Sequence, residues 1–432
     1  MRILVVGSGG REHALVWALK KTSSGPAEVF CAPGNAGVAE LAQCVAIGAT
    51  DVGALADFAQ REQIDLTMVG PEASLAEGIV DEFERRGLRI VGPSRQAAQL
   101  ETSKVFAKDF MQRHGIPTGR YRVAGSADEA IKILRSGEFG DESSPIVVKA
   151  DGLAAGKGVV VGRSRDEAEN ALADLVALGS AAKRILIEEA LAGPEASVLL
   201  FSDGKDFRLM PAARDHKRVG EGDTGPNTGG MGSITDASVI DYDVLKRVVR
   251  EIIDPTLRGA RADGFPFRGV LFIGLMLTSD GPRVLEYNVR FGDPETQAIL
   301  IRLQTDLFAI FEAIVDQRLG ELEVQWSNDS SACVVLAARG YPGKPETGTE
   351  IKGLDRAAQH ENVAIFHAAT SRGSNGEWLT AGGRVLGLTA TGETLDAALA
   401  RCYAAVDEIH WDGLHYRRDI GRTAAPNAVS GG

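Results

Sequence analysis

The chain has 432 residues and a formal net charge of −12, with 44% hydrophobic and 25% charged residues. This length predicts two to four domains with ample material for a core. The acidic balance argues against a general nucleic-acid or anionic-membrane binder, so we expect neither as a partner. The start shows no apolar run typical of a signal peptide, and nothing approaches a membrane span. The four cysteines are scattered, which predicts no zinc site or disulfide framework and fits reduced thiols in the cytoplasm.

The first hundred residues alternate short apolar strands with helical segments, which predicts a doubly wound parallel sheet. The expected strands are Ile3–Val6, Glu28–Cys31, Asp65–Val69 and Leu88–Val91, and the expected helices are Arg11–Lys20, Val52–Gln60 and Ala76–Arg86. Ligands of such sheets bind at the carboxyl ends of the strands. We therefore expect the loops 7–11, 32–37 and 70–72 to line one pocket.

A glycine-rich turn, Gly7–Gly10, lies between the first strand and the first helix. Backbone N–H groups and the helix dipole make such a turn a site for an anion. A dinucleotide-binding fingerprint would need a third glycine where Glu12 stands, and an acid closing the next strand, which instead runs into Ala32–Asn35. The pattern therefore disfavours NAD. It leaves open a phosphate bound at residues 9–11 or a purely structural turn.

The pattern changes near Glu101, where we place the first domain boundary. An amphipathic helix is expected over Lys104–His114, stopped by Gly115–Thr118. The stretch Ile146–Val161 then reads as a strand, a glycine-rich loop and a second strand. This loop carries Lys149, Gly152, Gly156, Lys157 and Gly158.

Glycines let backbone N–H groups approach an anion closely, and the lysines add positive charge, so this hairpin suits the phosphates of a nucleotide. It is not a Walker loop, because the glycine spacing is one residue short and a strand, not a helix, follows. A glycine-bearing hairpin with two solvated lysines is the alternative from these residues alone.

Two later loops have a composition suited to ligands. The strand Ile185–Glu189 ends in acids and precedes Gly193–Ser197, whose carboxylates could bind an adenine amino group and ribose hydroxyls. A solvated acidic loop is the alternative. The segment Asp215–Gly232 is nearly free of apolar residues and rich in glycine, which predicts a loop that covers a substrate.

A strand pair is expected at Val270–Leu277 and Arg283–Tyr287. The strict alternation that follows puts Glu286, Asn288 and Arg290 on one face. It puts Leu285, Tyr287 and Val289 on the other. A carboxylate and an amide oxygen on one face are hard ligands suited to Mg²⁺, and the arginine can hold an anion. Simple solvent exposure of this face is the alternative.

From about Gly320 the chain reads as a third, small β-rich domain. It contains the expected strands Cys333–Ala337, Val363–His367 and Arg384–Thr389 and the helix Leu395–Val406. The last residues, 423–432, are expected to be a frayed tail.

Taken together, these motifs resemble the ATP-grasp ligases and, among them, the glycinamide ribonucleotide synthetase family. The stretches that carry the resemblance are VVGSGGREHAL, APGNAG, VGPEASL, VKADGLAAGKGVVV, DHKRVGEGDTGPNTGGMG, EYNVRFGDPETQ, GYPGKP, AGGRVL and IHWDGLHYRRDIG. Each is weak alone, but their order over Arg2 to about Gly421 is very specific.

The resemblance implies a fold, with boundaries placed from the residues above. An N-terminal doubly wound domain (1–101) is followed by an ATP-grasp domain of two α+β lobes (102–320), with a mobile lobe at about 119–190. A small β-rich C-terminal domain (321–422) and a disordered tail (423–432) complete it. A monomer is expected.

The resemblance also implies an activity, the second step of de novo purine synthesis. ATP would phosphorylate glycine to glycyl phosphate, and the amine of 5-phosphoribosylamine would displace phosphate to give glycinamide ribonucleotide, with Mg²⁺ or Mn²⁺ as cofactor. The rival readings are a related carboxylate–amine ligase, a dinucleotide-dependent oxidoreductase and a non-enzymatic ATP-binding regulator.

The family's site residues carry over position by position. Catalysis, with glycine or the transferring phosphoryl group, falls to Asp215, Lys217 and Arg290. ATP binding falls to Lys104, Lys149, Gly152, Gly156, Lys157, Gly158, Glu188, Glu189 and Glu195. Substrate binding falls to Gly9, Gly10, Arg11, Asn35, Glu72 and Asp293, and metal binding to Glu286 and Asn288. Many ATP-grasp members carry a second metal carboxylate on the preceding strand, but Val270–Leu277 has none, so either fewer protein ligands are used or Asp293 or Glu295 helps.

Overall fold

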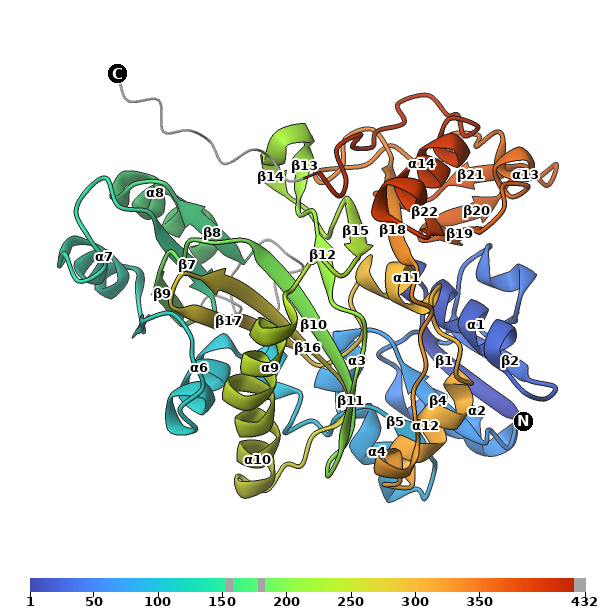
Figure 1. The fold of residues 1–432 in the computed structure, drawn as a ribbon, viewed down its shortest axis with the longest axis horizontal. Helices are drawn as coiled ribbons and strands as arrows, with labels where there is room; N and C mark the ends of the chain where they lie inside the picture. Colours follow the sequence, from blue (N-terminus) through green and yellow to red (C-terminus); the bar gives the residue numbers. More distant parts are fainter. Residues whose placement is uncertain (153–157, 178–182, 423–432) are drawn as a thin grey trace.

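A computed structural model describes residues 1–152, 158–177 and 183–422 (Figure 1). Gly156, Lys157 and the predicted tail lie outside these residues. The described chain forms an N-terminal parallel sheet, a small antiparallel lobe and a long central sheet that runs on into the C-terminal region. This confirms the predicted α/β class, with an ATP-grasp-like centre and a β-rich C-terminal region.

The N-terminal sheet has five parallel strands in the order β3-β2-β1-β4-β5. Its strands are β1 (Arg2–Gly7), β2 (Glu28–Pro33), β3 (Gln43–Cys44), β4 (Leu66–Val69) and β5 (Ile90–Val91). Alternate residues of β1 face opposite sides: Leu4 and Val6 join one core cluster, and Ile3 and Val5 another. The first cluster includes helices α2 (Val52–Arg61) and α4 (Ile79–Arg85), and the second includes α1 (Gly10–Thr22). Both faces are therefore covered, as a doubly wound sheet requires.

One predicted helix of this domain is wrong in its extent. The expected helix Ala76–Arg86 is instead two short helices, α3 (Glu72–Ala76) and α4, separated by Gly78. Gly78 has φ +82°, a left-handed conformation that glycine adopts without a Cβ clash and that cannot continue a right-handed helix.

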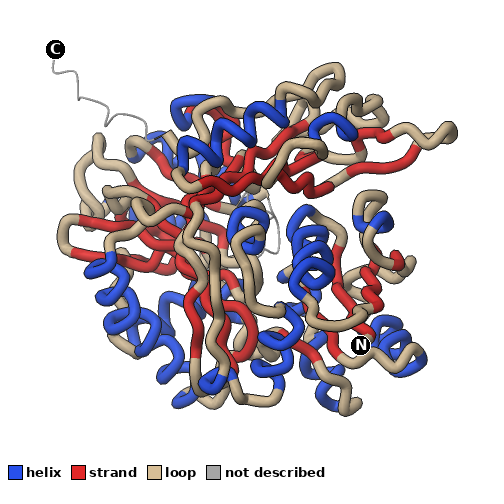
Figure 2. Tube along the Cα trace, turned by 45° about the vertical axis from the view of Figure 1, so that its right-hand side comes forward, coloured by secondary structure: helices blue, strands red, loops and turns tan. Residues whose placement is uncertain are grey.

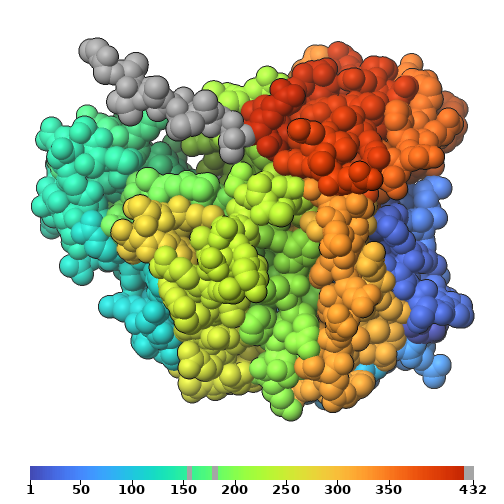
Figure 3. Space-filling view, viewed as in Figure 1, coloured from blue at the N-terminus to red at the C-terminus, as the bar shows by residue number. Residues whose placement is uncertain are grey.

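A small lobe follows the connecting helices α5 (Gln99–Thr102) and α6 (Lys104–Arg113). Its sheet has the order β6-β9-β7-β8 and is antiparallel throughout. The strands are β6 (Tyr121–Ala124), β7 (Ile146–Ala150), β8 (Val159–Gly162) and β9 (Ile185–Glu189), and the helices are α7 (Ala127–Arg135) and α8 (Arg165–Val176). Alanine, leucine, isoleucine and valine side chains of both helices and the strands make a core of the lobe's own. The lobe projects at the left of the molecule (Figures 1 and 3).

The central sheet has the strand order β17-β16-β10-β12-β15-β18-β22-β19, with β11 beside β10. Its first part comprises β10 (Glu195–Asp203), β11 (Phe207–Leu209), β12 (Ala213–Asp215), β15 (Gly232–Thr235), β16 (Arg268–Thr278) and β17 (Gly281–Asn288). Helices α9 (Tyr242–Val248) and α10 (Asp254–Ala262), joined by the π-helix η4 (Val249–Ile253), contribute to the first core cluster. Helices α11 (Glu295–Leu300) and α12 (Leu307–Val315) contribute to the second.

The C-terminal β-rich region continues this sheet. Strand β18 (Ser330–Ala337) pairs with β15, β22 (Arg384–Gly392) with β18, and β19 (Val363–His367) with β22. Helices α13 (Leu354–Ala357) and α14 (Leu395–Val406) join these strands in a third core cluster. A small hairpin of β20 (Thr370–Arg372) and β21 (Trp378–Thr380) completes the region. Figure 2 shows the resulting band of strands running across the molecule.

Two local departures from the sequence expectations bear on the site. The segment predicted as a substrate-covering loop contains a β-hairpin, β13 (Arg218–Gly220) and β14 (Thr224–Asn227). The predicted alternation in β17 fails at Leu285, because a register shift pairs Gly274 with Glu286 and the next residue with Val284. Leu285 is the extra residue of a β-bulge and lies on the pocket side with Glu286. Among the described residues, no helix is long and apolar enough to cross a membrane.

Candidate active site

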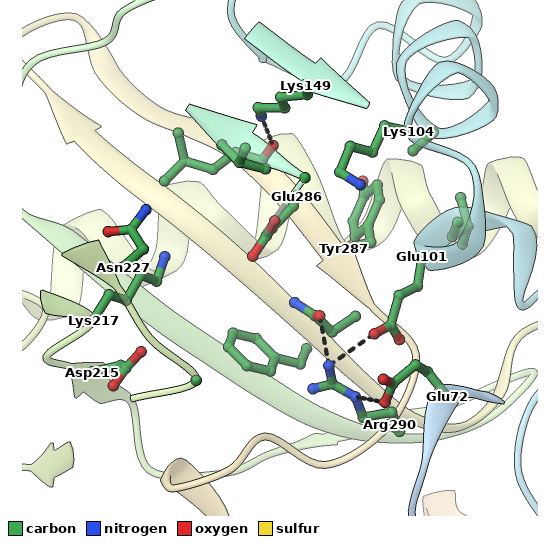
Figure 4. Close-up of a pocket in the computed structure, with 18 of the residues that line it drawn as sticks. Glu72, Glu101, Lys104, Lys149, Asp215, Lys217, Asn227, Glu286, Tyr287 and Arg290 are labelled. Carbon is green, nitrogen blue, oxygen red and sulfur yellow. Dashed lines mark hydrogen bonds and ion pairs between the residues drawn. The ribbon is translucent and has the colours of Figure 1, made fainter. Parts of the chain in front are cut away.

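A cavity of about 480 Å³ lies where the N-terminal sheet, the small lobe and the central sheet meet. Figure 4 shows lysines entering it from two sides and carboxylates between them. Twelve of the residues assigned from the sequence line this cavity, namely Arg11, Glu72, Lys104, Lys149, Gly158, Glu188, Asp215, Lys217, Glu286, Asn288, Arg290 and Asp293.

The N-terminal domain contributes Arg11 and Glu72 to the cavity. They follow β1 and β4, the adjacent strands between which the strand order of the sheet reverses. Crevices at such a switch point are where ligands of open α/β sheets bind. Arg11 is held there by its Nε, 2.6 Å from Glu12 Oε1, and by its Nη1, 3.2 Å from the Phe291 carbonyl oxygen.

The Glu12 side chain occupies the Gly7–Gly10 turn, for which the sequence left open either a bound phosphate or a purely structural role. Its carboxylate accepts a hydrogen bond of 2.6 Å from the Gly9 N–H. A Cβ on Gly7 or Gly70 would overlap the Glu12 side chain, so both positions need glycine for space. A carboxylate thus already occupies one of the backbone donors at this helix N-terminus, and an anion bound here would have to use other donors.

Arg290 contacts three other side chains that line the cavity (Figure 4). Its Nη2 donates to Glu101 Oε1 at 2.8 Å and to Asn288 Oδ1 at 3.0 Å, and its Nε donates to Glu72 Oε2 at 3.3 Å. Burial alone would lower the pKa of Arg290, but Glu101 and Glu72 outweigh it and raise that pKa. Coulombic attraction to the same arginine lowers the pKa of Glu72, although burial works in the other direction. Arg290 therefore ties the N-terminal domain to the end of β17.

Lysines of the small lobe and of α6 form the opposite wall. Lys149 is 5% exposed and lies 3.1 Å from Glu188 Oε1, while its Nζ donates to the Leu285 carbonyl at 3.2 Å. Lys108 is 3.0 Å from Glu188 Oε2. Desolvation lowers the pKa of Lys108 to about 8 and also lowers that of Lys104. Glu188 is thus held between two lysines, so its carboxylate is less available to a nucleotide than the sequence implied.

Glu286 is the acceptor at which these cations converge. Burial would raise the pKa of this carboxyl, but three nearby lysines outweigh burial and lower it. They are Lys217, Lys149 and Lys104. Within the described residues no hydrogen-bond donor is assigned to the Glu286 carboxylate, so it is free to bind a cation. Asn288 keeps a lone pair on Oδ1 beyond the one used by Arg290.

The donor set fits a magnesium ion bound together with a nucleotide. The described residues contain no group of three or more His, Cys, Asp or Glu side chains that could hold a metal by themselves. Mg²⁺ in nucleotide enzymes uses one or two protein oxygens and takes the rest from phosphates and water. The pair Glu286 and Asn288 meets that requirement without a further carboxylate.

A second acidic group lies near the base of the β13–β14 hairpin. Asp215 Oδ1 is buried and has no hydrogen-bond partner among the described residues. Burial and the neighbouring Glu295 raise the pKa of Asp215 well above its usual range. Lys217 donates to Glu195 Oε2 at 2.8 Å, and Arg384 lies 3.1 Å from Asp293 Oδ2. This corner therefore offers an unpaired carboxyl group to a small cationic ligand.

Six assigned residues lie in the described chain but not among the cavity-lining residues. They are Gly9, Gly10, Asn35, Gly152, Glu189 and Glu195. Asn35 bridges the carbonyls of Ser8 and His367, at 2.7 and 2.9 Å. Glu189 accepts hydrogen bonds from the N–H and Nε of Arg120. A Cβ on Gly9 would lie 3.5 Å from Asp293 Oδ2, so the glycine turn adjoins the cavity from behind that residue. Of the three loops expected to share the pocket, 32–37 contributes no lining residue.

Several cavity residues were not assigned from the sequence. They include Glu101, Lys108, Asn227, Thr228, Glu295 and Arg384. Glu101 marked only a domain boundary in the sequence, and Glu295 entered only as a possible metal ligand. Arg384 stands in the stretch AGGRVL, which contributed to the resemblance without a role. Asn227, Thr228, Glu295 and Arg384 lie inside quoted motifs, whereas Glu101 and Lys108 lie outside all of them.

The fold and the cavity define this protein as an ATP-grasp enzyme: two α+β units enclose a cavity with converging lysines and a carboxylate–amide pair. Sequence models of phosphoribosylglycinamide synthetase match its N domain at residues 1–101, its ATP-grasp (A) domain at 102–296 and its C domain at 331–423. The chain therefore belongs to the phosphoribosylglycinamide synthetase family.

Individual relatives agree with this assignment. A phosphoribosylamine–glycine ligase of Xanthomonas axonopodis pv. citri is 50% identical over 427 residues, covering 98% of this chain and 97% of that protein. The crystal structure of the phosphoribosylamine–glycine ligase of Thermotoga maritima superposes with a TM-score of 0.82 at 36% identity, covering 97% of this chain and all of that one. The biotin carboxylase domain of Hydrogenobacter thermophilus 2-oxoglutarate carboxylase shares the fold, with a TM-score of 0.69 at 15% identity over 96% of this chain and 91% of that one.

Proposed function

We propose that the chain joins glycine to 5-phosphoribosylamine at the expense of ATP, giving glycinamide ribonucleotide, ADP and phosphate in de novo purine synthesis. The observation that carries this proposal is the set of lysines converging on Glu286 in a cavity reached from the N-terminal domain, in a chain of this family. ATP is the expected nucleotide, and glycine and 5-phosphoribosylamine are the expected substrates. A monomeric state and a cytoplasmic location of the protein remain predictions.

The reaction needs two anions brought together, the glycine carboxylate and the triphosphate. The carboxylate oxygen attacks the γ-phosphorus, the bond to the β-phosphate oxygen breaks, and ADP and glycyl phosphate form. Phosphoryl transfer depends mostly on positioning and charge stabilisation. Lys104 and Lys149 supply fixed positive charge for the phosphates, since both enter the cavity and Lys149 is buried.

Glu286 and Asn288 are the residues that would hold Mg²⁺ or Mn²⁺. When bound, the ion neutralises phosphate charge that the lysines alone do not balance. The lowered pKa of Glu286 supports this role, because the carboxylate stays ionised at neutral pH beside its lysines. Asp293 and Glu295 are not needed for it, since two protein oxygens suffice beside phosphate oxygens.

Glycine carries an ammonium group as well as its carboxylate. The buried, unpaired oxygen of Asp215 supports binding of that ammonium, whose positive charge would favour the ionised form of the Asp215 carboxyl. Lys217, two residues further along the chain, would supply a positive charge for the glycine carboxylate. Asp215 and Lys217 thus orient glycine, with its carboxylate towards the nucleotide phosphates.

The second step forms the amide. The amine of 5-phosphoribosylamine attacks the carbonyl carbon of glycyl phosphate, the carbon–oxygen bond to phosphate breaks, and the nitrogen loses a proton. Arg11, Glu72 and Asp293 face the cavity from the N-terminal side and support binding of this substrate there. The Gly9–Gly10 turn adjoins the same corner through Asp293.

Release of ADP tests the proposal. We expect ADP formation to require both glycine and 5-phosphoribosylamine generated in situ, with glycinamide ribonucleotide identified by mass. ADP formation that is unchanged when glycine is left out would contradict it. Replacing 5-phosphoribosylamine by other amines separates this reaction from that of a related carboxylate–amine ligase. A saturable fluorescence change with NADH would instead favour an oxidoreductase.

A further inference from the structure

The C-terminal segment 415–421 binds the β13–β14 hairpin, although about two hundred residues separate them in sequence. The Arg418 N–H donates to Glu221 Oε1 at 3.1 Å, and the Gly222 N–H donates to Asp419 Oδ2 at 2.8 Å. His415 Nε2 donates to the Val219 carbonyl at 2.8 Å. The hairpin therefore depends on the C-terminal segment for its position.

Arg417 is the centre of this contact. Its side chain is 1% exposed, and it is among the largest fully buried side chains of the protein. Nη1 donates to the Arg218 carbonyl at 3.0 Å and to Asp223 Oδ1 at 2.8 Å, while Nε and Nη2 each donate to Asp419 at 2.8 Å. Burial lowers the pKa of Arg417, but Asp419 and Asp223 outweigh it and raise that pKa. A buried guanidinium with four hydrogen bonds of this kind is costly to bury, and its removal leaves part-buried carboxylate oxygens without this partner.

Both ends of the hairpin enter the cavity. Lys217 precedes β13, Asn227 ends β14, and Thr228 and Gly229 follow it, all four lining the cavity. The N–H and Oγ1 of Thr228 each donate to the Lys217 carbonyl at 2.8 Å, which closes the base of the hairpin. Any tilt of the hairpin thus moves Lys217 and Asn227 together.

We propose that Arg417 is a positioning residue that fixes the β13–β14 hairpin and, through the base of the hairpin, the cavity residues Lys217, Asn227 and Thr228. The proposal rests on the proposed function, because these residues matter through the glycyl phosphate that would form beside them. An acyl phosphate reached by water yields glycine and phosphate, so ATP is consumed without an amide being formed. Arg417 acts at a distance from the substrates, through the hairpin.

Only an arginine suits this position. The guanidinium fork pairs with both oxygens of Asp419 while its remaining donor reaches the hairpin backbone and Asp223. A lysine ammonium is a single point of charge and cannot span both sides in this geometry. Arg417→Lys is therefore expected to behave more like a loss than like a conservative change.

The test compares Arg417→Ala with Arg418→Ala in the full chain. The Arg418 side chain is 63% exposed and contacts Asp407 and the Tyr416 hydroxyl, neither of which belongs to the hairpin, so it is a matched control. We expect Arg417→Ala to lower kcat about tenfold to a hundredfold, as small misplacements of reacting groups do. The ratio of ADP to glycinamide ribonucleotide should rise well above the wild-type value, while binding of a non-hydrolysable ATP analogue stays within about twofold. Guanidinium at millimolar concentration should restore part of the coupling, and ammonium should not.

Asp223→Asn covers the case in which Arg417→Ala fails to fold. Asp223 is half-exposed and has φ +55°, a conformation that asparagine also tolerates, so this variant keeps the hairpin turn. It should raise the ADP-to-product ratio in the same direction by a smaller factor. A folded Arg417→Ala with the coupling of Arg418→Ala would overturn the proposal, and so would a fully coupled Asp223→Asn. If the wild type made no amide, the proposed function would fail instead.

Discussion

Arg290 shows how a residue's partners change its role. The sequence places it after Glu286 and Asn288 on one face and suggests that it holds an anion. In the folded chain its guanidinium already donates to Glu72, Glu101 and Asn288 and to the Phe291 carbonyl. Little donor capacity is left for a substrate. Its charge therefore balances two carboxylates, and its hydrogen bond orients the amide of Asn288 towards the cavity.

The local pattern could predict Glu286 and Asn288, because strand alternation depends only on near neighbours. It could not predict Glu101 or Arg384. Glu101 and its partner Arg290 are 189 positions apart in the sequence. Arg384 donates to the carbonyl of Asp293, which is 91 positions away. Such pairs are fixed by the packing of whole domains, and one sequence carries no signal for them beyond family resemblance. The same holds for Lys108, which pairs with Glu188 only in the folded lobe.

A change at Glu286 tests the metal assignment at the level of one residue. Glu286→Gln keeps the shape of the side chain and removes the charge that balances the converging lysines. We expect the Mg²⁺ concentration needed for half-maximal ADP release to rise at least about tenfold, since even residues that only support a ligand cost that much in metal affinity. The measurement is a Mg²⁺ titration of initial rate at saturating ATP.

Asp280→Asn is the control for that titration. Asp280 lies at the turn of the same β16–β17 hairpin, and its side chain is 79% exposed. It removes one carboxylate of the same hairpin without touching the cavity, so its Mg²⁺ requirement should match the wild type. An unchanged requirement in Glu286→Gln would remove Glu286 from the metal site.

At the scale of elements, the sequence predicted which segments are strands better than it predicted which sheet they join. Val363–His367 and Leu395–Val406 have the expected bounds as β19 and α14. Yet β18, β22 and β19 extend the central sheet, because β15 offers a free edge to β18. Apolar runs show that a strand is buried, but only long-range register shows which neighbour buries it. The same limit hid the bulge at Leu285, which depends on the pairing of β17 with β16.

The N-terminal turn offers a test of how an element depends on one buried carboxylate. Gly70→Ala would place a Cβ into the Glu12 side chain, which also holds the Gly9 N–H and Arg11. Because overpacking of this kind forces neighbours to move, we expect a loss of about 1–3 kcal/mol in the free energy of unfolding. Urea denaturation measures it.

Gly25→Ala is the matched control, because a Cβ there meets nothing within 4 Å. It should change the free energy of unfolding by less than about 0.5 kcal/mol, as surface substitutions usually do. If Gly70→Ala were as stable as Gly25→Ala, Glu12 would have room to move, and its place as a fixed filler of the turn would be wrong.

At the scale of the whole molecule, the N-terminal sheet, the central sheet, the C-terminal region and the small lobe differ in how they are joined. The N-terminal and central sheets share two core clusters, which contain β1 residues together with β10 and β16 residues. The central sheet and the C-terminal region share β-ladder pairing and a third cluster. The small lobe has a core of its own and reaches the rest through polar contacts such as Lys149 to the Leu285 carbonyl. We infer that this lobe is the part able to move as a unit, as the family resemblance implies for about 119–190.

Hydrogen exchange tests this mobility. Without ligand, amides of β7 and β9 should exchange faster than those of β10 and β16, because the lobe's small separate core can unfold as a unit while the two larger core clusters stay intact. A non-hydrolysable ATP analogue should slow exchange in β7 and β9, since Lys149 and Glu188 on these strands line the cavity. The strands β1 and β2 serve as the internal control and should change little. Equal slowing in the lobe, the central sheet and the N-terminal sheet, or no slowing in the lobe, would contradict a mobile lobe that closes on the nucleotide.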